Sequence, residues 1–378
     1  MAKQKKTTAQ GAVKRPTDQK TVAKLVGVAS NLVQQVSRRK DPQLLLPSRT
    51  LSNAKFNKTR RIIEMGAARQ TRELFNLTQA KSFMQTLLIA SALKENVESG
   101  KNCSLRALYY NCKHDIAGTS DPTFEGQEES DPIIEDVEVM LQALREELHV
   151  FAEVRGALAG PIVINDRGRD LDCMEMGSAG YSVPSIVEPD AIGFKSNKAR
   201  FILHLEKGTV WQRFYEDGFH EEHNCIITHG GGQPSRGVRR MLYRLHNELQ
   251  LPVYCVLDND PWGHYIYSVI KQGSINLAFE SQRMAVPAAR FLGLRSRDYE
   301  DFKLDRNVQI KMNEKDHKRA QQILNYPWFK GKKPWEKEIQ LMIDHNFKME
   351  VEALTNRGLS FVTETYVPAK LDRKDFLD

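Results

Sequence analysis

Three carboxylates follow two apolar runs that have the character of buried strands. Glu206 ends the run FILHLE, and Asp258 and Asp260 end the run PVYCVLDND. If the strands are parallel, their carboxyl ends meet at one edge of the sheet, where such sheets bind ligands. Unpaired carboxylates repel each other, and hard oxygen ligands suit Mg²⁺. The pattern predicts a Mg²⁺ site; the alternative is a solvated turn at Asp-Asn-Asp with Glu206 as a lone edge charge.

A second candidate for chemistry is the segment SLRALYY, residues 104–110. Helical spacing predicts an apolar face that carries Leu105, Leu108, Tyr109 and Cys112. It predicts a separate face that carries Arg106, Tyr110 and Lys113. Tyr109 is therefore the expected core residue, while Tyr110 is displayed beside two cations that favour its phenolate and could bind a phosphate. The alternative is a tyrosine with a purely structural role on a polar helix face.

The elements around the acids follow a strand–helix alternation. Apolar runs at 201–206, 225–229 and 252–260 predict strands, and residues 210–216 and 236–249 predict helices between them. This order is typical of a parallel sheet with right-handed crossovers, and hence of an α/β fold. The segment THGGGQP after the second strand is either a turn near a phosphate or an ordinary strand-to-helix loop.

The first 150 residues have a helical texture. Helices are predicted at Thr21–Val36, at Thr78–Lys94, from Ser104 as N-cap, and at Ile133–Leu148, after an acidic loop with two prolines. A short β segment is expected near Phe151–Ile164. Three helices with a short β segment are what a helix-turn-helix or winged-helix domain presents at this level of detail.

Composition narrows the class of partner. The net charge is +7, and residues 1–40 carry ten Lys or Arg but a single acid, Asp18. A basic arm favours an anionic partner, nucleic acid first, although a solvated tail would have the same composition. No apolar run reaches the roughly 18 residues of a membrane helix, no signal core begins the chain, and none of the five cysteines forms a CxxC pair. We expect an intracellular protein with free thiols and no membrane contact.

Several longer segments carry a family resemblance. They are RALYY, LEKGTVWQRFYEDGF (205–219), GGGQPSRGVRR (230–240), VLDNDPWGHYIYSVIKQGS (256–274) and KMEVEALTNRGLSFVTETYVPAKL (348–371). In this order and spacing, from about Arg69 to Leu371, the chain resembles the A subunits of DNA topoisomerase VI. These belong to the type IIB topoisomerases, a family that includes the related meiotic double-strand-break transesterase.

The resemblance implies a mixed α/β fold and three parts. They are a basic, partly disordered N-terminal extension (1–68), a winged-helix domain like that of catabolite activator protein (69–150), and a toprim metal-binding domain (151–378). It implies that Tyr110 attacks double-stranded DNA and becomes joined to the 5′ phosphate, with Arg106 positioning or activating that phosphate. Glu206, Asp258 and Asp260 would hold Mg²⁺.

The resemblance also implies an assembly. Two A subunits would form a homodimer and join two B subunits that carry a GHKL-type ATPase, giving an A2B2 enzyme that acts on DNA in the cell or nucleoid. The absence of a GxxxxGK[ST] segment from this chain is compatible with a partner that binds the ATP. Thr21–Val36 is a candidate docking helix for the B subunit.

Three rival functions remain at this stage. A meiotic-type transesterase would cut DNA without resealing it efficiently. A toprim nuclease would use metal and water, with Tyr110 structural. A winged-helix DNA-binding protein without enzymatic activity would leave the three carboxylates without a role.

Overall fold

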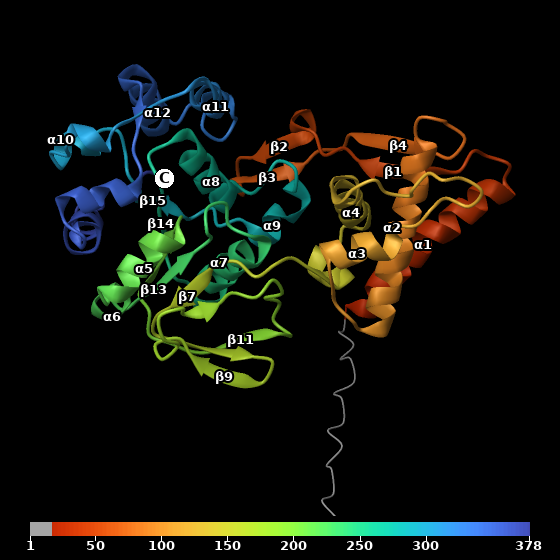
Figure 1. Ribbon diagram of the computed structural model, residues 1–378, viewed down its shortest axis with the longest axis horizontal. Helices are drawn as coiled ribbons and strands as arrows, with labels where there is room; N and C mark the ends of the chain where they lie inside the picture. The colour runs from red at the N-terminus through yellow and green to blue at the C-terminus, as the bar shows by residue number, and fades with distance from the viewer. Residues whose placement is uncertain (1–16) are drawn as a thin grey trace, which may run out of the picture. The chain divides into compact units, whose positions relative to one another are not determined.

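The computed structural model describes residues 17–378, which divide into two compact units (Figure 1). In the described part of the chain, the N-terminal unit consists of residues 17–48 and 66–153. The C-terminal unit consists of residues 49–65 and 154–378. The functional boundaries expected after residues 68 and 150 stay predictions.

The N-terminal unit is mainly helical. Its elements are α1 (Asp18–Ser37), β1 (Gln43–Pro47), β4 (Arg69–Glu73), α2 (Ala80–Ser99), β5 (Cys103–Ser104), α3 (Leu105–Cys112), α4 (Gln127–Leu141), the 3₁₀ turn η2 (Arg145–Leu148) and β6 (Val150–Phe151). Strands β1 and β4 pair antiparallel, and β5 pairs parallel with β6. Helices α2, α3 and α4 share one apolar core. The helices predicted at 21–36, at 78–94 and after Ser104 are confirmed, since they correspond to α1, α2 and α3.

Helix α3 begins where the sequence predicts. The Ser104 backbone is extended, and its Oγ accepts a hydrogen bond from the Ala107 N–H at 3.1 Å. This contact satisfies one of the amide groups that a helix leaves unpaired in its first turn. Leu108, Tyr109 and Cys112 are buried on one side of the helix, as the periodicity predicts.

The prediction of a helix at Ile133–Leu148 was wrong at both ends. Helix α4 starts six residues earlier, at Gln127, and contains Pro132. Glu128 and Glu129 lie in its first turn, where acidic side chains are favoured by the helix dipole. The helix ends at Leu141 because Gln142 takes a left-handed conformation, with φ 47°.

The C-terminal unit contains the larger sheet. Its strands are β2 (Ala54–Asn57), β3 (Ile62–Met65), β7 (Ala157–Ala159), β8 (Ile162–Asp166), β9 (Arg169–Asp172), β10 (Tyr181–Ser182), β11 (Ile192–Asn197), β12 (Phe201–Leu205), β13 (Cys225–His229), β14 (Val253–Val256), β15 (Arg290–Phe291), β16 (Ile310–Lys311) and β17 (Phe347–Lys348). Its α-helices are α5 (Gly208–Glu216), α6 (Phe219–Glu222), α7 (Arg236–Leu249), α8 (Pro261–Gln272), α9 (Ser281–Met284), α10 (Asp298–Asp301), α11 (Glu314–Asn325), α12 (Lys333–His345) and α13 (Val367–Asp372). Short 3₁₀ or π segments are η1 (Leu51–Asn53), η3 (Ala278–Glu280), η4 (Arg306–Val308), η5 (Val351–Arg357) and η6 (Val362–Tyr366).

The main sheet has six strands in the order β10-β7-β13-β12-β14-β15. Strands β13, β12 and β14 are parallel, as predicted, and β15, which was not predicted, continues the parallel set. Strand β7 pairs antiparallel with β13, and β10 pairs antiparallel with β7. Alternate residues of the strands point to opposite faces. Ile202 belongs to the core that contains α7 and α8, whereas Leu203 belongs to the core that contains α5. The sheet is therefore the middle of an α/β/α arrangement, in which Figure 1 shows α5 beside β13.

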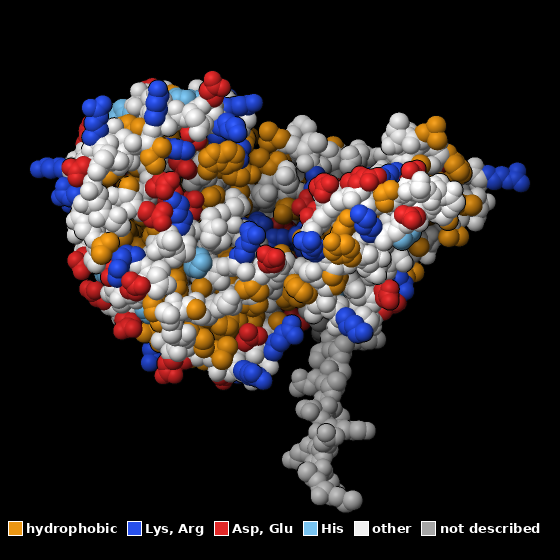
Figure 2. Space-filling view, viewed as in Figure 1, with side chains coloured by type: hydrophobic (Ala, Val, Ile, Leu, Met, Phe, Trp, Pro, Cys, Tyr) orange, Lys and Arg blue, Asp and Glu red, His pale blue; other side chains and the backbone are white. Residues whose placement is uncertain are grey.

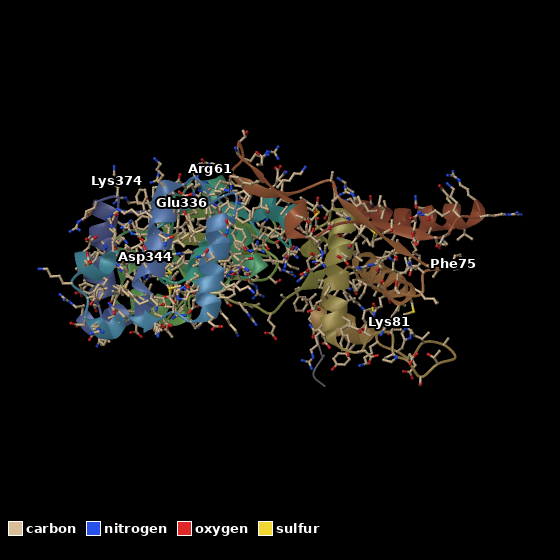
Figure 3. All side chains as sticks on the ribbon, turned by 90° about the horizontal axis from the view of Figure 1, so that it is seen from above. Arg61, Phe75, Lys81, Glu336, Asp344 and Lys374 are labelled. Carbon is tan, nitrogen blue, oxygen red and sulfur yellow. The ribbon has the colours of Figure 1, made fainter. Side chains whose placement is uncertain are left out.

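Three smaller sheets of this unit were not predicted as sheets, one of them the antiparallel pair β16 and β17. The β segment expected near Phe151–Ile164 covers β7 and the first residues of β8. Strands β11, β8 and β9 form an antiparallel sheet, and β2 and β3 form a hairpin. The side chain of Arg61 fixes the hairpin, because its Nη2 donates to the Pro287 carbonyl at 2.6 Å and lies 2.9 Å from Asp378 Oδ1. Figure 3 shows Arg61 on the same body as Glu336 and Asp344 of α12.

The sequence predicted no membrane-spanning helix and free thiols. Within residues 17–378, no helix is both long enough and apolar enough to span a membrane. All five cysteines are free, four of them buried and Cys103 half-buried. On the face of the C-terminal unit seen in Figure 2, basic and acidic side chains are interspersed.

The N-cap of α3 gives a first testable prediction. Replacing Ser104 by Ala removes the acceptor for the Ala107 N–H, which costs about 1 kcal/mol of helix stability. Hydrogen exchange measured on the peptides of α3 should therefore show about fivefold more frequent local opening. Ser104→Asp keeps a capping oxygen and should exchange like the natural chain. Equal protection in the Ala variant would show that the cap does not hold this helix.

Candidate functional site

The three predicted acids lie at the carboxyl edge of the parallel strands. Glu206 directly follows β12, Asp258 comes two residues after β14, and Asp260 is the N-cap of α8. Strands β12 and β14 are paired neighbours, so their ends are adjacent. The Asp258 N–H donates to Glu206 Oε2 at 3.1 Å, and an Asp260 oxygen accepts from the Gly263 N–H. The structure thus brings Glu206 and Asp258 into contact at the predicted strand ends, with Asp260 two residues further along the chain; their role as metal ligands stays a prediction.

Burial makes charge costly on all three acids. Burial, followed by the charge of Asp258, raises the pKa of Glu206 to about 8. Burial also raises the pKa values of Asp258 and Asp260, and the charge of Asp260 adds to the shift of Asp258. Such a cluster is stabilised when a cation neutralises it.

A lysine that the sequence analysis did not single out supplies part of that charge. Lys207 Nζ lies 3.1 Å from Asp258 Oδ2, 2.9 Å from Glu350 Oε2 and 2.8 Å from Glu352 Oε2. Three carboxylates therefore meet around one ammonium. Partial burial acts to lower the pKa of Lys207, but these contacts outweigh it and hold that pKa above its usual range.

The two glutamates come from a segment far along the chain. Met349 forms an antiparallel bridge with Asn259, and the Val351 N–H donates to Asp258 Oδ1 at 2.8 Å. This backbone pairing brings Glu350 and Glu352 to the carboxylate edge. Their spacing of two residues in KMEVE was the only signal in the sequence, and it did not indicate which strand end they join.

The donor set fits a hard divalent cation. Carboxylate oxygens are the ligands that such ions take, and the raised pKa values mark acids whose charge lacks compensation. Within residues 17–378, no group of three or more His, Cys, Asp or Glu side chains is already arranged around a common point as metal ligands would be. Lys207 is the cation that contacts Asp258, so occupation of the site by a metal requires these side chains to rearrange.

Two glycines allow the backbone to approach this edge. The Gly232 N–H donates to the Glu206 carbonyl at 2.8 Å, with Gly232 in the left-handed region at φ 92°. A Cβ on Gly263 would lie 2.5 Å from the Asp258 carbonyl oxygen. The loop 230–232 thus packs on the backbone of Glu206, and whether it also meets a phosphate stays a prediction.

Tyr110 lies on the exposed face of α3 in the N-terminal unit. Its side chain is 59% exposed, whereas Tyr109 is buried. The guanidinium carbon of Arg106 lies 5.9 Å from the centre of the Tyr110 ring. The prediction that Tyr109 is buried and Tyr110 is exposed is confirmed.

The prediction for Lys113 was wrong. Its Nζ donates to the Tyr109 hydroxyl at 2.8 Å and to the Glu125 carbonyl at 3.1 Å. A lysine at the last turn can reach either phenol, and here the carbonyl of Glu125 draws it to Tyr109. The hydrogen bond to Tyr109 raises the pKa of Lys113. Arg106 is thus the one cation of the predicted pair whose charged group lies over the Tyr110 ring.

Comparison with known families covers both units. Residues 201–371 match the family described as the Toprim domain of the topoisomerase 6 A subunit and Spo11. Residues 81–150 match Type IIB DNA topoisomerase, and residues 153–198 match the all-beta domain in the DNA topoisomerase VI alpha subunit.

Curated relatives extend over nearly the whole chain. The chain is 40% identical over 362 residues to the A subunit of type 2 DNA topoisomerase 6 from Pyrococcus abyssi, covering 93% of this chain and 94% of that protein. It is 38% identical to the protein of the same name from Hyperthermus butylicus, covering 92% and 93%. With that of Haloarcula marismortui the identity is 33%, covering 96% and 98%.

The charge balance around Lys207 can be tested without any enzymatic readout. Lys207→Met leaves Asp258, Glu350 and Glu352 without their shared cation, so in EDTA we expect the free energy of unfolding to fall by about 1–3 kcal/mol. A divalent ion should then bind more tightly, because no lysine competes for Asp258. Chemical denaturation with and without Mn²⁺, together with Mn²⁺ titration by electron paramagnetic resonance, measures both effects.

The control is Lys337→Met on the exposed face of α12, which removes the same charge from the surface. It should change neither quantity. Unchanged stability and unchanged Mn²⁺ affinity in Lys207→Met would contradict the role given to this lysine.

Proposed function

The chain belongs to the family of topoisomerase VI A subunits, which are type IIB DNA topoisomerases, and on that premise we infer that Tyr110 is the nucleophile with which it cleaves DNA. As the DNA-cleaving subunit of a type II topoisomerase, it opens a duplex for the passage of another and reseals it, which relaxes supercoils and decatenates DNA. We choose Tyr110 because its side chain is exposed beside Arg106, whereas its neighbour Tyr109 is buried.

The proposed step is a reversible transesterification. The phenolic oxygen of Tyr110 forms a bond to phosphorus as the bond from phosphorus to the 3′ oxygen breaks. The 3′ oxygen leaves with its electron pair and is protonated, while the phenol gives up its proton to water. The tyrosine is then joined to the 5′ phosphate. Attack by the 3′ hydroxyl reverses the step, so resealing consumes no further energy source.

Arg106 is proposed to act on the phosphate. Its guanidinium sits above the Tyr110 ring, one helical turn away on the same face of α3. From there it can bind a phosphate oxygen and stabilise the negative charge that develops during attack. The support is its position next to Tyr110; Lys113, which the sequence placed beside it, is engaged by Tyr109.

The Toprim family match and the acid cluster together support a divalent metal in the C-terminal unit. We propose Mg²⁺ as the ion, with Glu206, Asp258 and Asp260 as its protein ligands. When bound, the ion would supply Lewis-acid stabilisation of a phosphate oxygen. The contribution of the chain is to place these acids at one edge of the sheet, through the ends of β12 and β14 and the N-terminus of α8.

The partners are proposed from the family. They are double-stranded DNA, a second copy of this chain, and two B subunits with a GHKL-type ATPase in an A2B2 assembly. Helix α1 is the proposed docking element for B, since Val26, Val33 and Val36 expose apolar side chains on it. The place of action is DNA inside the cell.

The finer assignment of domains is likewise a proposal. Residues 69–150 form a winged-helix domain, supported by helices α2, α3 and α4 around one core with the β5–β6 pair beside them. Residues 1–68 are a basic extension, of which 1–16 lie outside the described residues. Residues 151–378 form the toprim part, with linker and C-terminal additions.

A cleavage assay tests the nucleophile. The chain is mixed with its cognate B subunit, supercoiled plasmid, Mg²⁺ and an ATP analogue, and the reaction is stopped with detergent. Linear DNA with protein on its 5′ ends is expected from the natural chain. It should be absent with Tyr110→Phe, because the attacking oxygen is gone.

Tyr109→Phe is the matched control, since it removes a hydroxyl one residue away that serves Lys113 and the Glu125 carbonyl. It should still give covalent adducts. Cleavage that persists in Tyr110→Phe without adducts would favour a metal-dependent nuclease. Adducts that form but never reseal would favour the meiotic-type transesterase, and DNA binding without cleavage would favour a non-enzymatic DNA-binding protein.

A further inference from the structure

One of the four tryptophans is set apart from the others. Trp262 is 46% exposed, whereas Trp211, Trp328 and Trp335 are at most 3% exposed. A single exposed apolar side chain is common on protein surfaces, so a function for Trp262 has to be argued from its neighbours. Nothing in the proposed chemistry so far uses this side chain.

The position of Trp262 is fixed relative to the proposed metal ligands. It follows Asp260, the N-cap of α8, and Pro261, the first residue of that helix. Proline sets its own backbone angle, and the cap sets the start of the helix. Two residues span at most about 7 Å, so the backbone of Trp262 stays close to Asp260. The backbone that carries the indole thus lies within two residues of the acid cluster.

A guanidinium covers part of the indole. The Arg319 guanidinium carbon lies 4.5 Å from the centre of the Trp262 ring and 3.9 Å from that of Tyr265. Its Nη1 donates to the Tyr326 hydroxyl and to Gln322 Oε1, each at 3.2 Å. Its Nε is buried and has no hydrogen-bond partner among the described residues. The arginine is therefore held in place over the two rings, and its positive charge stays beside the indole.

The charge that α11 contributes around this pair is positive on balance. Lys315 lies one turn before Arg319 on the same face of α11, and Lys318 is its neighbour; both are exposed. Asp316 is buried and paired with Lys348 at 3.0 Å, so of the two nearby acids only Glu314 is exposed. An exposed aromatic ring, a fixed guanidinium and two lysines together match a nucleotide, whose flat or sugar face packs on the ring while its phosphate meets the cations.

We propose that Trp262 and Arg319 form a nucleotide-binding platform for duplex DNA, next to the phosphate that the acid cluster and its metal would engage. The inference rests on the proposed function. The continuity with the acid cluster and the positive charge favour DNA over a protein partner. The platform positions the duplex and takes no part in bond making.

Tryptophan fluorescence reports on this site directly. Because the other three indoles are buried, acrylamide quenching of the full-length chain reports mainly on Trp262. Adding a short duplex in EDTA, where no cleavage occurs, should protect the accessible fraction from acrylamide. In Trp262→Phe the DNA-dependent change should vanish, which assigns the signal to this indole and not to the buried ones.

Affinity measured by fluorescence anisotropy of labelled duplex gives the second readout. Trp262→Ala should weaken binding about five- to one-hundredfold. Arg319→Gln should weaken it and lower the slope of log affinity against log salt by about one. The matched control is Arg200→Gln, which removes one charge at the opposite end of β12 from Glu206 and should leave both values unchanged.

The outcomes separate the inference from the function on which it rests. If the natural chain binds and, with its partner, cleaves duplex while Trp262 stays open to acrylamide, the platform is wrong and the function stands. Protection of Trp262 that depends on protein concentration and not on DNA would make this face a protein contact, which also overturns the inference. If the natural chain binds no duplex at all, the proposed function fails with it.

Discussion

Three carboxylates gathered at one edge of the main sheet set the central electrostatic constraint on the C-terminal unit. Asp258 is buried, and Glu206 and Asp260 are half-buried. Glu206, Asp258 and Asp260 are held together because adjacent parallel strands end side by side, and burial raises the pKa of each. Such an arrangement is stable where protons or cations reduce its negative charge and the surrounding packing holds it. Lys207 neutralises part of the negative charge of these acids, and a divalent ion would neutralise the rest.

The surrounding elements hold the carboxyl edge of the main sheet in place. The two apolar cores lie on opposite faces of the sheet and fix β12 and β14, while the Met349–Asn259 pairing brings the C-terminal segment back over the strand ends. The N-terminal unit meets a different requirement: α3 must bury one tyrosine and display the next. Ser104 starts that helix in the register that puts Tyr109 into the core, so Tyr110 faces solvent with Arg106.

The sequence predicted the features that depend on the spacing of nearby residues, namely which side chains share a helix face and where strands end. Helical spacing separated Tyr109 from Tyr110, and apolar runs placed Glu206 and Asp258 at strand ends. The contacts of Lys207 with Glu350 and Glu352 join residues 143 and 145 positions apart, which no periodicity reveals. The hairpin at 54–65 belongs to the same unit as residues 154–378. The sequence did not reveal this either, because the two parts are far apart along the chain. The start of α4 was missed because Pro132 is typical of a helix breaker, although the helix retains it.

The most direct measurement of the central claim is anomalous diffraction from crystals of the chain grown with Mn²⁺. The account predicts a manganese peak within about 2.3 Å of oxygens from Glu206, Asp258 and Asp260, with Lys207 moved away from Asp258. A structure at saturating Mn²⁺ that shows no peak there and keeps Lys207 on Asp258 would contradict it, because the acid cluster would then be neutralised by the protein alone.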